Sequence, residues 1–255
     1  MRYRLRRYHL RGRLLLAVLA AMLLGGTARG ADFGNLYGYL DWASEYRYYG
    51  ASESNRHAVI QGGLHWAMPE NYYAGVFATG VDYADFRGTN YELDFYGGRH
   101  FYFDSNDLNL EALYSATPGT AGHPSYAAPG TIYPGYNFFE ACAELTHSFG
   151  ALSLGGKVLI EPRPDSHGGF LGSANGSASY AVTDWLKASA DVGHQWIALR
   201  PDATYWDIGA AATWRRQWVL DVRYYGTDIA KADCYFQNWC EPAVVAKVTY
   251  NFVVL

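Results

Sequence analysis

The stretch that decides the fold lies at residues 91–96 and reads Tyr91-Glu92-Leu93-Asp94-Phe95-Tyr96. Tyr91, Leu93 and Phe95 point one way along it, and the two acids point the other way. Successive side chains of a β-strand lie on opposite faces, so the segment predicts a ribbon with one apolar and one polar face. Similar segments recur from Phe33 to Phe252, with almost no helical pattern between them.

Twelve strands are predicted from this alternation, each of about ten residues or more, which is the length a tilted strand needs to cross a membrane. No linker or charge block divides them, so we expect an all-β chain with one up-and-down antiparallel β-barrel. The predicted strands are 33–49, 57–68, 72–83, 90–103, 106–116, 135–148, 151–161, 172–183, 186–199, 203–214, 217–227 and 242–252.

The connections between the predicted strands alternate in length. Short ones lie at 69–71, 104–105, 149–150, 183–185 and 215–216, and longer ones at 50–56, 84–89, 117–134, 162–171 and 228–241; only 200–202 breaks the order. Short periplasmic turns and long extracellular loops are typical of transmembrane barrels, as is an abundance of Tyr and Trp. The alternative is a soluble β-sandwich, whose strands also alternate but whose polar face lies outside.

The N-terminus reads as a cleavable secretory signal over residues 1–30, which leaves 31–255 as the barrel. It has an arginine-rich start, an apolar run from Leu14 to Leu24 and a small-residue site at Ala28-Arg29-Gly30. The run is too short for a spanning helix, although an N-terminal anchor is the alternative. Without the seven arginines of this segment, 13 basic residues face 24 acidic ones, a net charge of −11. Nucleic acid, which needs a basic surface, is therefore not an expected partner.

Parity along the strands assigns twelve ionisable residues to the polar face that would line the lumen. Eight acids and four bases favour passage of cations or neutral polar solutes. Alternatively, these groups pair and fill a narrow lumen, and the closed barrel acts as an adhesin, receptor or structural protein through its outer loops. The residues are Glu92, Asp94, Glu140, Glu144, Lys157, Glu161, Lys187, Asp191, Asp207, Asp221, Arg223 and Lys247.

The three cysteines indicate an oxidising compartment rather than a metal site. Cys234 and Cys240 flank a predicted outer loop and are expected to form a disulfide, because the interval between them offers no His or acid for a metal. Cys142 is left as a free thiol beside Glu140 and Glu144. No metal or cofactor is expected, and His100, His123, His167 and His194 are too scattered for a zinc cluster.

One segment has the residue types of an outer-membrane acyl hydrolase, which pairs Ser with His. It is Thr146-His147-Ser148, where parity points His147 to lipid and no neighbouring acid or amide is placed to orient its ring. We therefore expect no enzyme activity. The Pro- and Gly-rich loop from Thr117 to Pro134 could hang outward as a recognition surface or fold inward as a constriction.

Several stretches resemble the TorF porin family, bacterial exported proteins that carry a domain of unknown function. They are Glu45-Tyr46-Arg47-Tyr48-Tyr49-Gly50, Gln61-Gly62-Gly63, Tyr73-Ala74-Gly75-Val76-Phe77, Val81-Asp82, Glu92-Leu93-Asp94-Phe95-Tyr96-Gly97-Gly98, Ala232-Asp233-Cys234, Cys240 and Ala243-Val244-Val245. The resemblance implies an outer-membrane barrel of the porin type. We expect the barrel to contact lipid, to pass small hydrophilic solutes and to be a monomer or small homo-oligomer. Such barrels end on an aromatic residue, whereas this chain adds Val253–Leu255 after Phe252.

Overall fold

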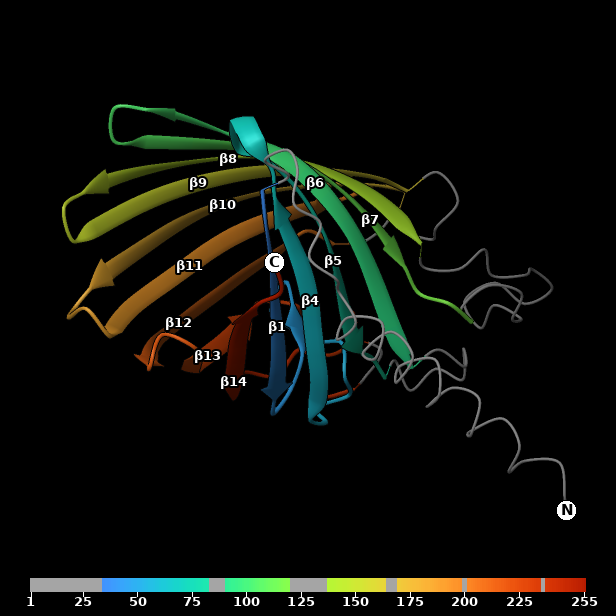
Figure 1. The fold of residues 1–255 in the computed structure, drawn as a ribbon. Coiled ribbons are helices and arrows are strands. Elements are labelled where there is room, and N and C mark those ends of the chain that lie inside the picture. Colours follow the sequence, from blue (N-terminus) through green and yellow to red (C-terminus); the bar gives the residue numbers. More distant parts are fainter. Residues whose placement is uncertain (1–33, 83–89, 120–136, 164–168, 199–200, 235–236) are drawn as a thin grey trace, which may run out of the picture.

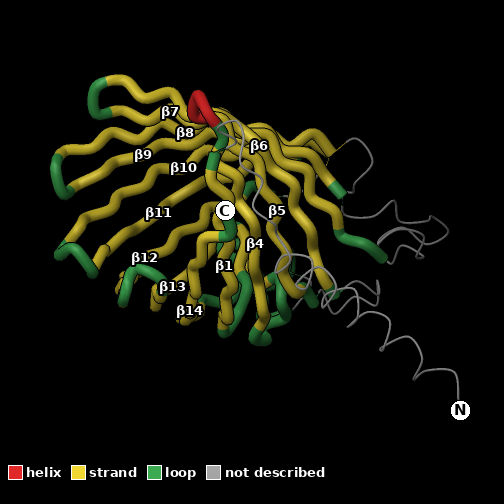
Figure 2. The backbone as a smooth tube through the Cα atoms, viewed as in Figure 1, coloured by secondary structure: helices red, strands yellow, loops and turns green. Residues whose placement is uncertain are grey.

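Twelve strands close into a single antiparallel barrel in a computed structural model that describes residues 34–82, 90–119, 137–163, 169–198, 201–234 and 237–255 (Figures 1 and 2). The predicted signal segment 1–30 lies outside the described residues. The barrel strands are β1 (Asn35–Ala43), β4 (Val59–Ala67), β5 (Tyr72–Gly80), β6 (Tyr91–Phe103), β7 (Asn106–Ala116), β8 (Phe138–Phe149), β9 (Leu152–Arg163), β10 (Gly169–Ala181), β11 (Leu186–Ile197), β12 (Ala203–Trp214), β13 (Trp218–Thr227) and β14 (Ala243–Val253).

The first and last barrel strands close the ring. β1 pairs antiparallel with β4 on one side and with β14 on the other. The three residues after Phe252 extend this closure, because the Val254 amide donates to the Leu36 carbonyl at 2.8 Å and the Leu36 amide donates to Leu255 at 3.2 Å. A closed ring leaves no unpaired strand edge, which is the condition for a sheet to sit in lipid.

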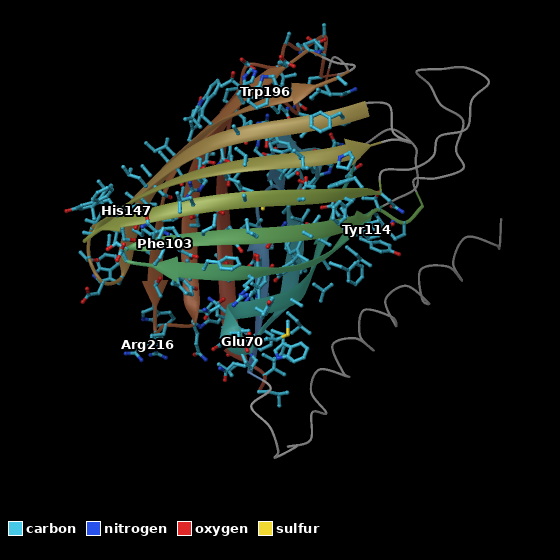
Figure 3. The ribbon with its side chains drawn as sticks, turned by 90° about the horizontal axis from the view of Figure 1, so that it is seen from above. Glu70, Phe103, Tyr114, His147, Trp196 and Arg216 are labelled. Atoms are coloured by element: carbon cyan, nitrogen blue, oxygen red, sulfur yellow. A yellow bond between two sulfur atoms is a disulfide. The ribbon has the colours of Figure 1, made fainter. Side chains whose placement is uncertain are left out.

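The outer face of the barrel is apolar in the middle and aromatic at both ends. Large side chains exposed there include Val158, Val192, Ile208 and Val222 near mid-strand. By their positions in the strands, exposed rings gather toward one end at Phe103, Phe149, Trp185, Trp214 and Trp218, and toward the other at Trp42, Tyr114, Phe139 and Trp196. Figure 3 labels Phe103, Tyr114 and Trp196 among them. An apolar band between two aromatic girdles is the surface of a transmembrane barrel, and it places this chain in the bacterial outer membrane.

Connection lengths separate the two ends of the barrel. At the short-turn end lie the 3₁₀ turn η1 (Pro69–Asn71) and tight turns after β6, β8, β10 and β12. The other end carries the longer connections, and we call it the long-loop end (Figure 1). The connection predicted at 162–171 is shorter than expected, because β9 continues to Arg163 and β10 starts at Gly169, directly opposite.

The predicted first strand, 33–49, was too long. β1 ends at Ala43, and the chain then forms a small hairpin from β2 (Arg47–Tyr48) and β3 (Ala51–Ser52) before β4 begins. Tyr49 and Gly50 at its tip have φ of 49° and 79°, the paired left-handed residues of a type I′ turn. The alternating pattern continues through this segment, which explains why it read as strand. Among the described residues, no helix is long and apolar enough to cross a membrane.

Candidate functional site: the barrel lumen

The twelve ionisable residues predicted for the lumen occupy strand positions opposite in parity to the exposed apolar side chains. Cross-strand registers bring several of them together, among them Glu144 with Lys157 and Asp221 with Lys247. Asp191 faces Asp207 in the same way and accepts a hydrogen bond from Asn175 at 2.9 Å. These register pairs place charged groups side by side on the inner face.

Three further acids share this face: Asp41 on β1 and Asp107 and Glu111 on β7. The parity argument covers them too, so the same signal could have found them. Asp107 accepts from the ring of His100 at 2.8 Å, and Glu111 accepts from the hydroxyl of Tyr73 at 2.8 Å. His100 thus belongs to the inner wall, while His123 and His167 lie outside the described residues. The described part of the chain contains no group of three side chains that could hold a metal ion.

Charge is unevenly distributed around the wall. Among the described inner side chains, strands β9–β14 carry four acids and four bases, whereas β1 and β4–β8 carry acids without Lys or Arg. The acids of this second wall, which we call the acidic wall, are Asp41, Glu92, Asp94, Asp107, Glu111, Glu140 and Glu144. A surface of one sign beside a balanced one attracts cations to one side of the lumen.

Arg223 organises the balanced wall. Its guanidinium pairs with Asp207 through Nη1 and with Asp221 through Nη2 at 3.4 Å. Nη2 also donates to the hydroxyl of Ser189 at 2.7 Å, so three neighbouring strands are joined. A planar donor fork of this kind holds two carboxylates that would otherwise repel one another.

The β2–β3 hairpin turns into the barrel and reaches the wall on the far side. Tyr48 donates a hydrogen bond from its hydroxyl to Glu140 on β8, which lies five strands from β1 in one direction around the ring and seven in the other. Tyr46 donates to Glu92 on β6 at 3.2 Å. Burial raises the pKa of both phenols well above its usual value, and the neighbouring carboxylates add to the rise. The hydroxyls therefore stay protonated and act as donors.

The hairpin also contacts the balanced wall. The ring of Tyr49 lies 5.0 Å from that of Tyr205 on β12, centroid to centroid. A Cβ placed on Gly50 would come within 2.6 Å of the carbonyl of Gly226 on β13, so the tip is in direct contact with that strand. Together with Tyr48, these contacts span the lumen from wall to wall.

Every barrel strand has a buried inner residue near the long-loop end. None of them is more than 9% exposed, and they form a complete ring: Asp41, Gln61, Thr79, Glu92, Ser115, Glu140, Glu161, Ser173, Gln195, Ala203, Thr227 and Val245. Toward the short-turn end, by contrast, Lys187 and Thr213 are exposed and Ser153 and Val219 partly so. The hairpin thus fills the lumen at the long-loop end. The inner face toward the other end is less uniformly buried, although Tyr73 is only 5% exposed there.

The loop from Thr117 to Pro134 was the segment proposed to fold inward or outward. Most of it lies outside the described residues. Its first residue, Thr117, is buried, and the Thr117 amide donates to Oδ1 of Asn137 at 2.9 Å. In the described structure it is the first connection, 44–58, that enters the lumen.

Cys234 and Cys240 are joined by a disulfide, and Cys142 is free on the inner face of β8 between Glu140 and Glu144. The joined pair lies in the connection between β13 and β14, next to the hairpin.

His147 does have an amide beside it, contrary to the sequence interpretation. Its Nδ1 lies 2.9 Å from Oδ1 of Asn106, which β7 brings opposite it across the sheet. The residues two positions away on the same face are Leu145 and Phe149, which supply no hydroxyl. Ser148 points to the other face and hydrogen-bonds Ser153 at 3.2 Å. These residues do not form a Ser–His–amide trio.

Comparison with solved structures finds the same fold in outer-membrane porins. The NanC porin superposes with a TM-score of 0.56 at 7% identity, covering 85% of this chain and 98% of that one. The KdgM porin gives a TM-score of 0.54 at 6% identity, covering 84% and 98%. No curated protein matches the sequence. A family model described as a bacterial protein of unknown function, Gcw_chp, matches residues 35–253, and the chain therefore belongs to the Gcw_chp family.

Proposed function

We propose that this protein is a passive outer-membrane channel for small hydrophilic solutes, with a lumen that favours cations. The acidic wall carries the proposal, because the inner positions of β1 and β4–β8 hold seven acids and, among the described residues, no Lys or Arg. The porin fold and the resemblance to the TorF porin family support it. We place the short turns in the periplasm and the long loops outside the cell, and we expect a monomer or small homo-oligomer.

Planar-bilayer recordings of the purified protein test this function. We expect stepwise conductance, and in a KCl gradient a reversal potential of the sign that cation preference gives. Glu111→Gln combined with Glu144→Gln removes two acids that the hairpin does not bind, and should shift that potential toward zero. Asp184→Asn, in a short turn on the outside of the lumen, is the matched control and should leave it unchanged.

Two results would count against the proposal. No steps in any of several salts would exclude a channel. If steps are seen but the Glu111→Gln/Glu144→Gln variant has the same reversal potential as the wild type, the acidic wall does not line the conducting path.

A second function is favoured by the buried ring at the long-loop end. A barrel closed there would pass nothing and would act through its outer loops, as a receptor, adhesin or structural protein. Absence of conductance together with retention of the folded barrel on the cell surface would select this function.

A further inference from the structure

We propose that residues 44–58 are a plug that closes the long-loop end of the lumen, and that the Cys234–Cys240 connection is the latch that holds the plug in place. This inference rests on the proposed channel function, but the position of the plug in the lumen can be tested without measuring conductance. The plug is defined as residues 44–58 and the latch as Cys234 together with 237–241.

The plug is attached to the wall by specific polar contacts rather than by general packing. Tyr46 and Tyr48 bind the two carboxylates Glu92 and Glu140, which lie on strands three and five positions from β1 around the ring. Each tyrosine hydroxyl satisfies an acid that the plug has buried, and a buried carboxylate without a donor is costly. When the plug is seated, the two tyrosine hydroxyls offset the free-energy cost of burying Glu92 and Glu140. When the plug withdraws, both carboxylates return to water.

Within the plug, the chain is held in shape by its own contacts. Arg47 pairs with Glu45 at 2.9 Å and donates to the Gly50 carbonyl at 2.7 Å. The hydroxyl of Ser54 accepts from the Tyr46 amide at 2.9 Å and donates to the His57 carbonyl at 2.8 Å. The hairpin is therefore a preformed unit that can move as one body.

The latch covers the plug from the outside. The Ser52 amide donates to the Trp239 carbonyl at 3.0 Å, and the Trp239 indole donates to Asn55 at 2.8 Å. Arg56 donates to the Asn238 carbonyl at 3.0 Å. The disulfide restricts the connection that makes these contacts, so it maintains the latch without touching the lumen.

The barrel does not need the plug to close. Ala43 at the end of β1 and Val59 at the start of β4 are paired directly. A four-residue turn can therefore replace residues 45–57 without changing the register of either strand. This plug-less variant is the main test, and its folding is checked by circular dichroism and by the heat-dependent shift of the band in gel electrophoresis.

Conductance distinguishes the plug from an open mouth. We expect the wild type to open in brief, infrequent steps, and the plug-less variant to conduct continuously, with mean current raised roughly tenfold because a twelve-strand interior lies between filled and channel-forming sizes. Cys234→Ser/Cys240→Ser should fall between the two, with more frequent openings. Equal currents in wild type and plug-less variant would overturn the plug while leaving the channel intact, and an unchanged latch variant would overturn the latch.

Crosslinking tests the seating of the plug by itself. A Cβ atom built on Gly50 would lie 3.2 Å from the Cβ atom of Tyr205, which is close to the Cβ–Cβ distance found in disulfides. In a Cys142→Ser background, Gly50→Cys with Tyr205→Cys should form a disulfide, mapped by mass spectrometry, and Gly50→Cys with Ser179→Cys should not. Because a side chain at Gly50 also meets the Gly226 carbonyl at 2.6 Å, a thermodynamic cycle of Tyr48→Phe and Glu140→Gln is measured beside the crosslink. Failure of the first pair to join, together with no coupling between Tyr48 and Glu140, would overturn the plug. A joined pair in a barrel whose plug-less form passes no current would uphold the plug and exclude the channel function.

Discussion

Arg223 is predicted to be the most important single charge for the stability of the balanced wall. Arg223→Gln leaves Asp207, Asp221 and Ser189 without the guanidinium that joins them. Asp207 and Asp221 then lie as like charges on neighbouring strands. The neutral amide keeps much of the length of the side chain, so the change chiefly removes charge.

The size of the effect follows from the geometry. At the 3.4 Å separation between Arg223 and Asp221, the Coulomb energy is about 1 kcal/mol in a water-like dielectric and about 5 kcal/mol at an effective dielectric of about 20. The three side chains are only 14–20% exposed, but desolvation offsets part of the attraction. We therefore expect a loss of about 2–4 kcal/mol in the free energy of unfolding.

Urea unfolding in lipid vesicles, followed by tryptophan fluorescence, measures this loss. Asp207→Asn alone and the double variant complete a thermodynamic cycle, whose coupling energy should be about 1–3 kcal/mol. Lys187→Gln, which removes a more exposed base from the same wall, is the control and should cost less than half as much. A coupling energy below about 0.5 kcal/mol would refute the reasoning, because it would show that the lumen screens the pair fully.

Three other predictions concern the two faces and the wall. Ile208→Lys, on the outer face at mid-strand, should cost about 2–4 kcal/mol in the same assay, whereas Ser177→Lys on the inner face should cost less than half of that; equal costs would mean that the faces are assigned wrongly. Gly75→Val should destabilise the barrel by roughly 1–3 kcal/mol, because its Cβ would come within 2.3 Å of the Tyr96 ring. A wild-type melting temperature would contradict that. Cys142 should react at least about tenfold faster with a cationic than with an anionic methanethiosulfonate, since the three acids Glu111, Glu140 and Glu144 lie around it against the single base Lys157; mass spectrometry of the labelled protein measures both rates, and equal rates would contradict an acidic lumen.

Sequence reasoning predicted the barrel well because the evidence for it is local. Alternation is a property of neighbouring residues, and strands such as β7 (Asn106–Ala116) and β12 (Ala203–Trp214) match their predicted bounds. The same parity placed the twelve ionisable residues on one face. Asp41, Asp107 and Glu111 were missed, although each lies in a predicted strand and has the lumen parity.

The interactions across the lumen could not be predicted in this way. Asn106 reaches His147 only because β7 pairs with β8 in one particular register. The uneven charge of the wall depends on the order of strands around the ring, which brings the acids of β6, β7 and β8 together and sets the lysines on the other side. Neither register nor ring order can be read from a single strand.

The sequence alone established that this protein is a membrane barrel with a polar interior. A period of two divides the side chains between two faces, and the strand lengths, the aromatic residues and the alternating connection lengths assign the apolar face to lipid. Only the tertiary structure decided what occupies that interior. Tyr48 and Glu140 are separated by 92 positions, and they meet because the first connection leaves the sheet and crosses the lumen. The sequence of this connection still alternates like a strand. The pairing of β1 with β4 nevertheless ends at Ala43 and Val59, so residues beyond Ala43 are not part of the barrel wall. Their polar atoms therefore bind partners inside the lumen.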